Sequence, residues 1–187
     1  MSNGPILVIS GTNRAQSNAM RIARILETEY QNAKTPAEVF PLTELPPEIF
    51  DSSAYTNKPP PMVAIQQRVL AASGLHIVTP EYNGSFPGVL KYFIDMLKFP
   101  ESFEHKPVAF VGEANGAWGA VRSVEQLIQI FHYRNAHVFP DRVFIPDIRS
   151  RFNEKGELTD AAIAQRLHKQ AVGFGQFVLR FQAGSAA

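Results

Sequence analysis

The stretch ILVISGTNRAQSN, residues 6–18, decides the fold because it joins a buried strand to the start of a helix. Its first four residues are all apolar and show no alternation with polar residues, which is typical of a strand covered on both faces of a parallel sheet. The polar residues from Ser10 to Asn18 then lead into an amphipathic segment. That segment predicts a helix over residues 19–30, with Ser17 or Asn18 as its N-cap.

The same strand-to-helix transition recurs along the chain. Residues 75–78 and 108–111 are short apolar runs that end at turn-forming residues, and they predict two more buried strands. Weaker strand candidates are residues 38–42 and residues 137–145, the second of which is interrupted by Pro140. The predicted helices cover residues 19–30, 62–72, 89–97, 121–131 and 160–181.

Strands that alternate with helices predict right-handed βαβ units, so this chain fits a three-layer α/β sandwich around a parallel sheet. We expect the last helix to begin after Thr159 as its cap. The proline-rich residues 44–61 are expected to form a long loop.

Length and composition exclude several classes of protein. The chain has 187 residues, which predicts a single domain over residues 1–187. With 18 basic and 17 acidic residues its net charge is +1, so no overall field favours nucleic acid or an anionic membrane. The absence of cysteine excludes disulfides, thiolate metal sites and cysteine nucleophiles. No apolar run approaches the roughly 20 residues that span a bilayer, and residues 1–5 lack the features of a signal peptide. We therefore expect a cytoplasmic protein without a metal and without a nucleic-acid or membrane partner.

The loops that follow the three strong strands are the places to search for a site, because parallel sheets bind ligands beyond the carboxyl ends of their strands. The first loop combines hydroxyl and amide side chains with Arg14 and runs directly into a helix. Hydroxyls, the free N–H groups of a helix N-terminus and an arginine favour a phosphate group. An ordinary capped loop has the same composition and stays open as the alternative. The loop lacks the lysine of a Walker loop and the three glycines of a dinucleotide fingerprint.

The second and third loops add an aromatic turn and a glycine-rich segment. Residues 79–88 contain Tyr82 and Phe86, either of which can flank a planar ligand or pack back on the core. Residues 112–120 contain three glycines and Trp118, which either leave space beside the sheet edge or form a flexible turn. Together, the three loops are typical of a site for a planar phosphorylated cofactor such as FMN.

Three motifs resemble the NADPH-dependent FMN reductase family, which includes quinone, chromate and azo-dye reductases. The most specific is TPEYNGSFPGVLK, residues 79–91, followed by an Ile-Asp pair. The loop over residues 10–18 resembles the family's phosphate loop, and residues 116–122 resemble its third segment of two glycines and an arginine. The resemblance spans about residues 6–145. It implies a flavodoxin-like three-layer sandwich with a five-stranded parallel sheet in the order 2-1-3-4-5.

The resemblance also implies which residues hold FMN. The first loop would bind the phosphate, the TPEYN motif would border the isoalloxazine ring, and the third loop would close its other side. Glu113 stands where the family usually carries serine or threonine, and a carboxylate there disfavours additional negative charge nearby. The implied cofactor-binding residues are Ser10, Thr12, Asn13, Arg14, Ser17, Asn18, Pro80, Glu81, Tyr82, Asn83, Gly84, Glu113, Asn115 and Gly116.

The implied activity is hydride transfer from NAD(P)H through flavin N5 to quinones, azo compounds, chromate or free flavin. This chemistry needs no catalytic side chain, because the cofactor carries it. We therefore interpret Glu81 and Asp95 as turn and helix-surface residues rather than as acid–base catalysts. The five histidines are interpreted as structural or solvated, namely His76, His105, His132, His137 and His168.

Several alternatives stay open. The electron donor is NADPH or NADH, with Arg14 and Arg122 as candidates for the 2′-phosphate. The protein is alternatively a flavodoxin-like FMN-binding module without NAD(P)H turnover, or an enzyme for another phosphorylated ligand. The resemblance implies a homodimer or homotetramer, and aromatic residues are enriched at such interfaces. We expect some of the following aromatic residues at the interface: Phe93, Phe99, Phe103, Phe131 and Tyr133.

Overall fold

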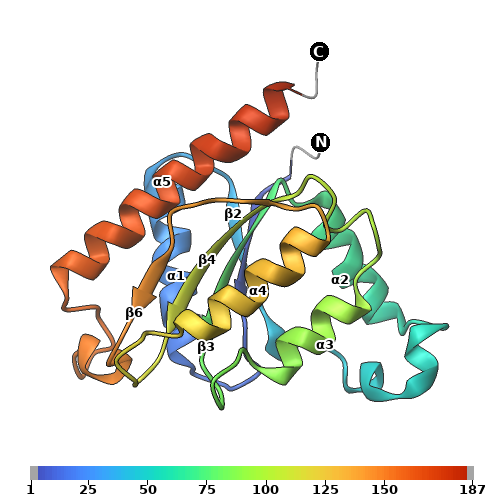
Figure 1. Cartoon of the computed structure of the whole chain (residues 1–187), viewed down its shortest axis with the longest axis horizontal. Coiled ribbons are helices and arrows are strands. Elements are labelled where there is room, and N and C mark those ends of the chain that lie inside the picture. The colour runs from blue at the N-terminus through green and yellow to red at the C-terminus, as the bar shows by residue number, and fades with distance from the viewer. Residues whose placement is uncertain (1–3, 185–187) are drawn as a thin grey trace.

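The computed structural model of the chain describes residues 4–184 and shows a parallel β-sheet with helices on both faces (Figure 1). The first three and last three residues of the predicted 1–187 domain lie outside the described part. The strands follow the order β2-β1-β3-β4-β5 and pair in parallel, which confirms the predicted order. Their bounds are β1 Ile6–Ser10, β2 Ala37–Pro41, β3 Gly74–Pro80, β4 Pro107–Glu113, β5 His137–Val138 and β6 Val143–Ile145.

The predicted fifth strand is divided into two short strands that both pair with β4. β5 pairs with Pro107 and Val108 at the beginning of β4, whereas β6 pairs with Val111, Gly112 and Glu113 at its end. Pro140, which lies between β5 and β6, has no N–H group to donate, so it interrupts the strand. The sheet therefore has a sixth strand, and β6 brings the segment that follows it to the carboxyl end of β4.

The α-helices confirm the five predicted helices, with ends shifted by up to about three residues. They are α1 Asn18–Asn32, α2 Pro60–Ala71, α3 Gly88–Met96, α4 Val121–Tyr133 and α5 Ala161–Gly184. Ile6 and Val8 of β1 pack in one apolar cluster with α1 and α5. Leu7 and Ile9 pack in a second cluster with α2, α3 and α4. Both faces of β1 are apolar because helices cover both, which makes three layers.

The proline-rich segment is not the featureless loop that its composition predicts. It contains the 3₁₀ helices η2 Pro47–Phe50 and η3 Ser52–Tyr55, after η1 Leu42–Glu44. Ile49 and Ala54 are buried in the apolar core. Burial of these two side chains orders the segment, an effect that local composition does not reveal.

The cap of α5 also differs from the prediction. Oδ1 of Asp160 accepts the backbone N–H groups of Ala162 and Ile163, each at 3.0 Å. The hydroxyl of Thr159 donates instead to the carbonyl oxygen of Arg151 at 3.1 Å. A carboxylate satisfies two free N–H groups of a helix start, so Asp160 caps the helix rather than Thr159.

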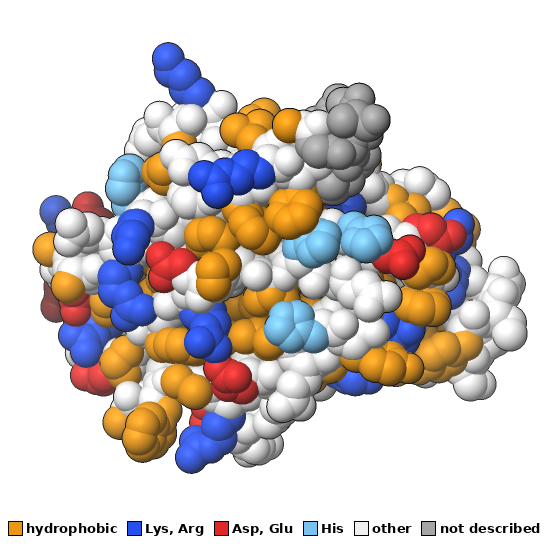
Figure 2. Space-filling view, turned by 45° about the horizontal axis from the view of Figure 1, so that its top comes forward, with side chains coloured by type: hydrophobic (Ala, Val, Ile, Leu, Met, Phe, Trp, Pro, Cys, Tyr) orange, Lys and Arg blue, Asp and Glu red, His pale blue; other side chains and the backbone are white. Residues whose placement is uncertain are grey.

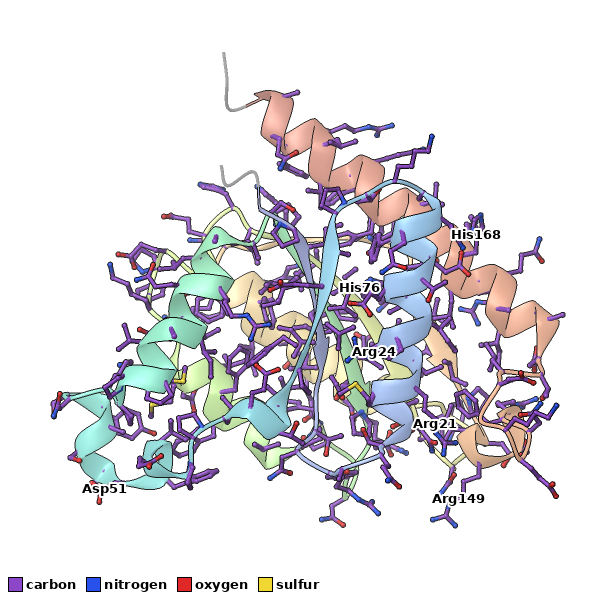
Figure 3. All side chains as sticks on the ribbon, turned by 180° about the vertical axis from the view of Figure 1, so that it is seen from behind. Arg21, Arg24, Asp51, His76, Arg149 and His168 are labelled. Atoms are coloured by element: carbon purple, nitrogen blue, oxygen red, sulfur yellow. The ribbon has the colours of Figure 1, made fainter. Side chains whose placement is uncertain are left out.

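A fully buried histidine joins the sheet to the two helices of one face (Figure 3). Nδ1 of His76 lies 2.7 Å from the hydroxyl oxygen of Tyr30 on α1, and Nε2 lies 3.1 Å from Oε1 of Gln170 on α5. Nε2 of Gln170 donates to the carbonyl oxygens of Phe110 and Asp141, at 2.9 and 2.8 Å. Because Oε1 of Gln170 only accepts, Nε2 of His76 carries the proton. Burial lowers the pKa of His76 to about 4, so the ring is a neutral structural element.

Three of the aromatic residues expected at an interface belong to the core instead. Phe93, Phe103 and Phe131 are buried in the cluster between the sheet and α3 and α4. Phe99 and Tyr133 are 58% and 79% exposed. On the face drawn in Figure 2, basic and acidic side chains are interspersed. Among residues 4–184, no helix combines the length and the apolar character needed to cross a bilayer.

Candidate functional site

The candidate site is a cavity of about 300 Å³ at the carboxyl ends of β1, β3, β4 and β6. It lies beside the point where the strand order reverses between β1 and β3, which is where sheets of this order bind ligands. Eight of the predicted cofactor-binding residues line it, namely Arg14, Ser17, Asn18, Pro80, Glu81, Tyr82, Glu113 and Asn115. The other lining residues are Ala15, Gln16, Ala114, Ile148 and Arg149.

The loop after β1 presents hydrogen-bond donors to this cavity. Oγ of Ser17 accepts the N–H of Met20 at 3.2 Å, so Ser17 is the N-cap of α1 and the first turn of the helix faces the site. Gln16 has a positive φ of 54°, and within residues 4–184 the backbone N–H groups of Ala15 and Gln16 have no partner. Free N–H groups at a helix N-terminus, together with the Arg14 side chain, form the donor set that a phosphate requires.

Two of the predicted residues are buried and do not line the cavity. Ser10 and Thr12 are buried, and Oγ of Ser10 has no hydrogen-bond partner among the described residues. Oγ1 of Thr12 lies 2.9 Å from the hydroxyl oxygen of Tyr82 and accepts the N–H of Arg14 at 3.3 Å. Asn13 is exposed and does not line the cavity. Thr12 therefore sets the shape of the loop, and a direct role for Ser10 or Asn13 stays a prediction.

The loop after β3 forms a tight turn at the cavity edge. Tyr82 and Ser85 exchange two backbone hydrogen bonds, of 2.8 and 3.0 Å, around Asn83 and Gly84. Both central residues have positive φ, 53° and 74°, as a two-residue hairpin turn with the sequence Asn-Gly requires. Asn83 and Gly84 thus form the tip of the turn and do not line the cavity. Tyr82 lines the cavity, as expected for an aromatic residue that flanks a planar ligand. Phe86 instead packs against the core, which was the other expectation for these two aromatic residues.

The glycines of the third loop allow close packing against neighbouring backbone and do not open space for a ligand in the cavity. A Cβ atom at Gly119 would lie 2.8 Å from the backbone nitrogen of Ile145, so only glycine fits between the loop and β6. Gly116 has open space around it but does not line the cavity, and neither does Trp118, which is 67% exposed. The sequence also predicted that Gly112 and Glu113 belong to this loop. Both lie in β4, because β3 and β6 pair with them on either side.

Glu113 is the unusual residue of the site. Glu113 lines the cavity and is only 5% exposed, and the backbone N–H of Ala19, in the first turn of α1, is one of the groups that favour its ionised form. Burial raises the pKa of Glu113 to about 7, against the lowering effects of the Ala19 hydrogen bond and the Arg14 charge. The chain thus places one of its own carboxyl groups against the helix terminus that suits an anion.

The remaining charged candidates have ion-pair partners. Glu81 pairs through Oε1 with Arg122 at 3.4 Å, and its Oε2 is buried without a partner in the described part of the chain. Asp95 pairs with Lys91 on the surface of α3 at 2.7 Å and does not line the cavity. Among the described residues, no group of three or more potential metal ligands occurs.

Sequence reasoning missed the part of the wall that follows β6. Ile148 and Arg149 belong to the 3₁₀ helix η4 Ile148–Arg151, and Arg149 is exposed at the edge of the sheet (Figure 3). The rule that ligands bind beyond strand ends applies to this strand as well. The sequence placed the end of this strand candidate correctly at residue 145, but its pattern was weaker than those of the three strands whose following loops were expected to form the site.

The donor set fits FMN, which consists of a flat ring system and one phosphate. Free backbone N–H groups, Ser17 and Arg14 suit the phosphate, the orphaned hydroxyl of Ser10 lies at the same strand end, and Tyr82 borders the cavity. A parallel sheet in this order, with a phosphate-type loop at its switch point, defines a protein of the flavodoxin-like class.

Residues 5–149 match the family described as NADPH-dependent FMN reductase, so the chain belongs to that family. It is therefore an oxidoreductase whose cofactors are FMN and NAD(P)H. An NAD(P)H-dependent FMN reductase of Pseudomonas aeruginosa is 30% identical over 127 residues, which are 66% of this chain and 69% of the relative. An NADH:(hydroxy)cinnamate reductase subunit of Vibrio ruber is 28% identical over 158 residues, 82% of this chain and 77% of that protein. An FMN-dependent NADPH-azoreductase of Staphylococcus aureus is 32% identical over 114 residues, 59% of this chain and 60% of the relative.

Solved structures agree on the fold. A flavoenzyme NAD(P)H:(acceptor) oxidoreductase from Paracoccus denitrificans superposes with a TM-score of 0.76 at 20% identity, covering 95% of this chain and 98% of that chain. Oxidised flavodoxin 2 from Bacillus cereus gives a TM-score of 0.63 at 16% identity, covering 93% and 99%. These similarities confirm the predicted flavodoxin-like architecture.

Proposed function

We propose that the protein binds FMN in the cavity at the ends of β1, β3, β4 and β6 and reduces small acceptors with NAD(P)H. The observation that carries this proposal is the meeting of a phosphate-type loop and an aromatic turn at the switch point of the sheet. The acceptors that we propose are azo compounds, quinones, free flavin and chromate. The azoreductase and FMN reductase relatives support the first and third of these classes. We propose further that residues 1–187 form one FMN-binding domain, and the need for NAD(P)H favours a cytoplasmic location.

The residues of the cavity divide by the part of FMN that they suit. Arg14, Ser17 and Asn18 lie at the start of α1, where the helix dipole and free N–H groups favour the phosphate. Pro80, Glu81 and Tyr82 line the same cavity, and we propose that they border the ring. The chemistry that bound FMN would supply is acceptance of hydride from NAD(P)H and delivery of reducing equivalents to the oxidant. The protein supplies position and electrostatics, and no side chain is required as a nucleophile.

The distribution of arginines favours NADPH as the donor. Arg122 pairs with Glu81, and Arg14 lies at the phosphate loop. Arg149 lines the same cavity and is exposed. Among the described residues Arg149 has no ion-pair or hydrogen-bond partner for its side chain, and a free guanidinium suits a phosphate, so we propose that it contacts the 2′-phosphate of NADPH. The ratio of kcat/KM for NADPH to that for NADH should therefore fall about tenfold in Arg149→Gln, and an unchanged ratio would exclude this role.

A groove beside the site supports a homodimer. It has a volume of about 530 Å³ between α3 and α4, and the exposed rings of Phe99 and Tyr133 line it. The guanidinium of Arg134 lies over both rings, 4.1 and 5.2 Å from their centres. Gln126 also lines the groove and hydrogen-bonds to the turn that carries Tyr82, so a partner here adjoins the site.

The oligomer is tested by sedimentation at micromolar concentration. We expect a dimer for the native chain and a folded monomer for the double variant Phe99→Ser/Tyr133→Ser. A native protein that sediments as a monomer would refute the dimer, and a native tetramer would show that a second interface exists.

The activity is tested by the visible spectrum of the purified protein during anaerobic titration. We expect FMN fluorescence to be quenched on binding, and the flavin absorption bands to bleach when NADPH is added. Restoration of the bands by a quinone, an azo dye or free flavin identifies the acceptor class. FMN binding without bleaching by NADPH or NADH would favour the binding module without turnover. Failure to bind FMN would refute the proposed function.

A further inference from the structure

We propose that Glu113 couples FMN binding to proton uptake, so that FMN with its phosphate binds tightly only when this carboxyl group is protonated. The inference rests on the proposed FMN site and concerns a buried carboxyl group in the wall of that site. It makes Glu113 a determinant of cofactor affinity rather than a catalytic residue.

The first observation is the position of the carboxylate. Glu113 is the last residue of β4 and lines the cavity together with Arg14 and the start of α1, whose N–H group at Ala19 favours the ionised form of the carboxyl group. Ser17, the cap of that helix, lines the same cavity. Ala15 and Gln16, which carry the free backbone N–H groups, line it as well. A phosphate that binds to this loop therefore comes close to the Glu113 carboxyl group and competes with it for the same positive helix end.

The second observation is that the backbone of Glu113 is held on both sides. Its carbonyl oxygen accepts the N–H of Glu81 at 3.2 Å, and the N–H of the next residue, Ala114, donates to the carbonyl oxygen of Ile145 at 3.1 Å. The strand pairs Pro80 with Glu113 on one edge and Glu113 with Ile145 on the other. The residue cannot withdraw from the cavity by a backbone shift, so it accommodates an anion by rotating its side chain or by taking up a proton.

The third observation is the charge around the carboxyl group. The other titratable side chains that line the cavity are Arg14 from the first loop, Glu81 and Tyr82 from the second, and Arg149 from η4. Arg14 favours the ionised form of Glu113, but burial outweighs it, and the pKa lies near 7 before any ligand binds. The phosphate of FMN adds up to two negative charges, which raise the pKa of a neighbouring carboxyl group further.

The expected consequence is a loss of affinity as the pH rises. Between about pH 7 and about pH 8.5 the phosphate of FMN is already a dianion, so its own titration contributes little in this window. Glu113 changes from about half protonated to almost fully ionised over the same window, so FMN affinity should fall about tenfold. Riboflavin has the same ring without the phosphate, and its affinity should stay nearly constant.

The test is a fluorescence titration with FMN and with riboflavin across this window, at constant ionic strength. The native chain should show the loss of affinity for FMN alone. Glu113→Gln removes the charge at nearly constant volume, so its FMN affinity should be independent of pH and at least as high as that of the native chain at about pH 7. Asp95→Asn removes a carboxylate from the surface of α3 and should keep the native pH dependence.

Calorimetry gives a second readout that needs no variant. Titration of the native protein with FMN in buffers of different ionisation enthalpy should show that about 0.5 to 1 proton is taken up for each FMN bound near pH 8. A flat affinity for FMN, a pH dependence that persists in Glu113→Gln, or an equal dependence for riboflavin would each overturn the inference. Failure of every variant to bind FMN at any pH would instead refute the FMN site itself, so the two outcomes are distinguishable.

Discussion

The hydroxyl oxygen of Tyr82 lies 2.9 Å from Oγ1 of Thr12, and this contact joins the loop after β1 to the turn after β3. The two residues are 70 positions apart in the chain. The same threonine oxygen accepts the N–H of Arg14, so one hydroxyl group organises the phosphate-type loop and orients the aromatic ring that borders the cavity. The two halves of the candidate site are therefore coupled before any cofactor binds.

Loss of this contact should weaken FMN binding without disturbing the fold. Tyr82→Phe keeps the ring and removes the hydroxyl, so it costs one hydrogen bond of about 0.5 to 1.5 kcal/mol, which is about a two- to tenfold loss of FMN affinity. Fluorescence titration measures the change. Tyr55→Phe removes a hydroxyl from the exposed helix η3 and serves as the matched control, with no change expected. Equal affinity of Tyr82→Phe and the native chain would show that the contact does not organise the site.

Arg14 should contribute to phosphate binding and not to ring binding. Arg14→Gln removes a charged donor from the first loop, and a hydrogen bond to a charged group is worth about 1.5 to 3 kcal/mol, so FMN affinity should fall at least about tenfold. Riboflavin affinity should stay the same, and the dependence of FMN affinity on salt should become weaker. Arg24→Gln, on the exposed surface of α1, is the control. A parallel loss of riboflavin affinity would place Arg14 at the ring instead.

His76 should make the protein less stable in acid. Its pKa is about 4 in the folded chain and 6.5 ordinarily, so below about pH 6.5 the unfolded chain binds a proton that the folded chain does not. The stability is fully present above pH 6.5 and is lost as the pH falls towards 4, by about 2 kcal/mol at about pH 4.5. Urea unfolding at a series of pH values measures this loss.

Glu113 has the opposite effect on the pH dependence of the free energy of unfolding. The contribution of His76 is therefore measured most directly in a variant that lacks the Glu113 carboxyl group. The pKa of Glu113 is about 7 in the folded chain and ordinarily 4.5. As the pH falls from 7 to 4.5, the folded chain therefore binds a proton before the unfolded chain does, and the folded state gains stability. The free energy of unfolding of Glu113→Gln should therefore fall more steeply between about pH 6.5 and about pH 4.5 than that of the native chain. A Glu113→Gln curve that is flat in this range would contradict the assignment to His76.

Lys106 should stabilise the end of α2. Its Nζ donates to the carbonyl oxygens of Val69, Leu70 and Ala72, at 3.3, 3.3 and 2.6 Å, where the helix leaves its last carbonyls unpaired. Lys106→Met fills similar volume without a donor and should lower the free energy of unfolding by about 1 to 3 kcal/mol. Lys98→Met, at an exposed ion pair, should change it by less than about 0.5 kcal/mol. Urea unfolding that gives equal values for both variants would show that Lys106 does not cap the helix.

Local sequence patterns predicted the regular elements well. The run Ile6–Ile9 is apolar at every position because helices cover both faces of β1, and Ser17 is one of the two caps that the sequence offered for α1. The patterns were least informative where distant residues decide the outcome. Ile49 and Ala54 order a proline-rich segment by reaching the core, and Glu113 lies in a strand because two neighbouring strands pair with it.

The sequence alone predicted the alternation of strands and helices and the loops that form the site. It also predicted the strand order, through the resemblance of its motifs to the family. These depend on residue periodicity and on short motifs, which are local properties of the chain. Only the tertiary structure decided that Thr12 meets Tyr82, that Arg149 completes the wall, and that Glu113 lines one cavity with the start of α1. Those contacts join strand ends that are far apart in the chain, and the physical reason is that the register of the parallel sheet brings these ends to one edge.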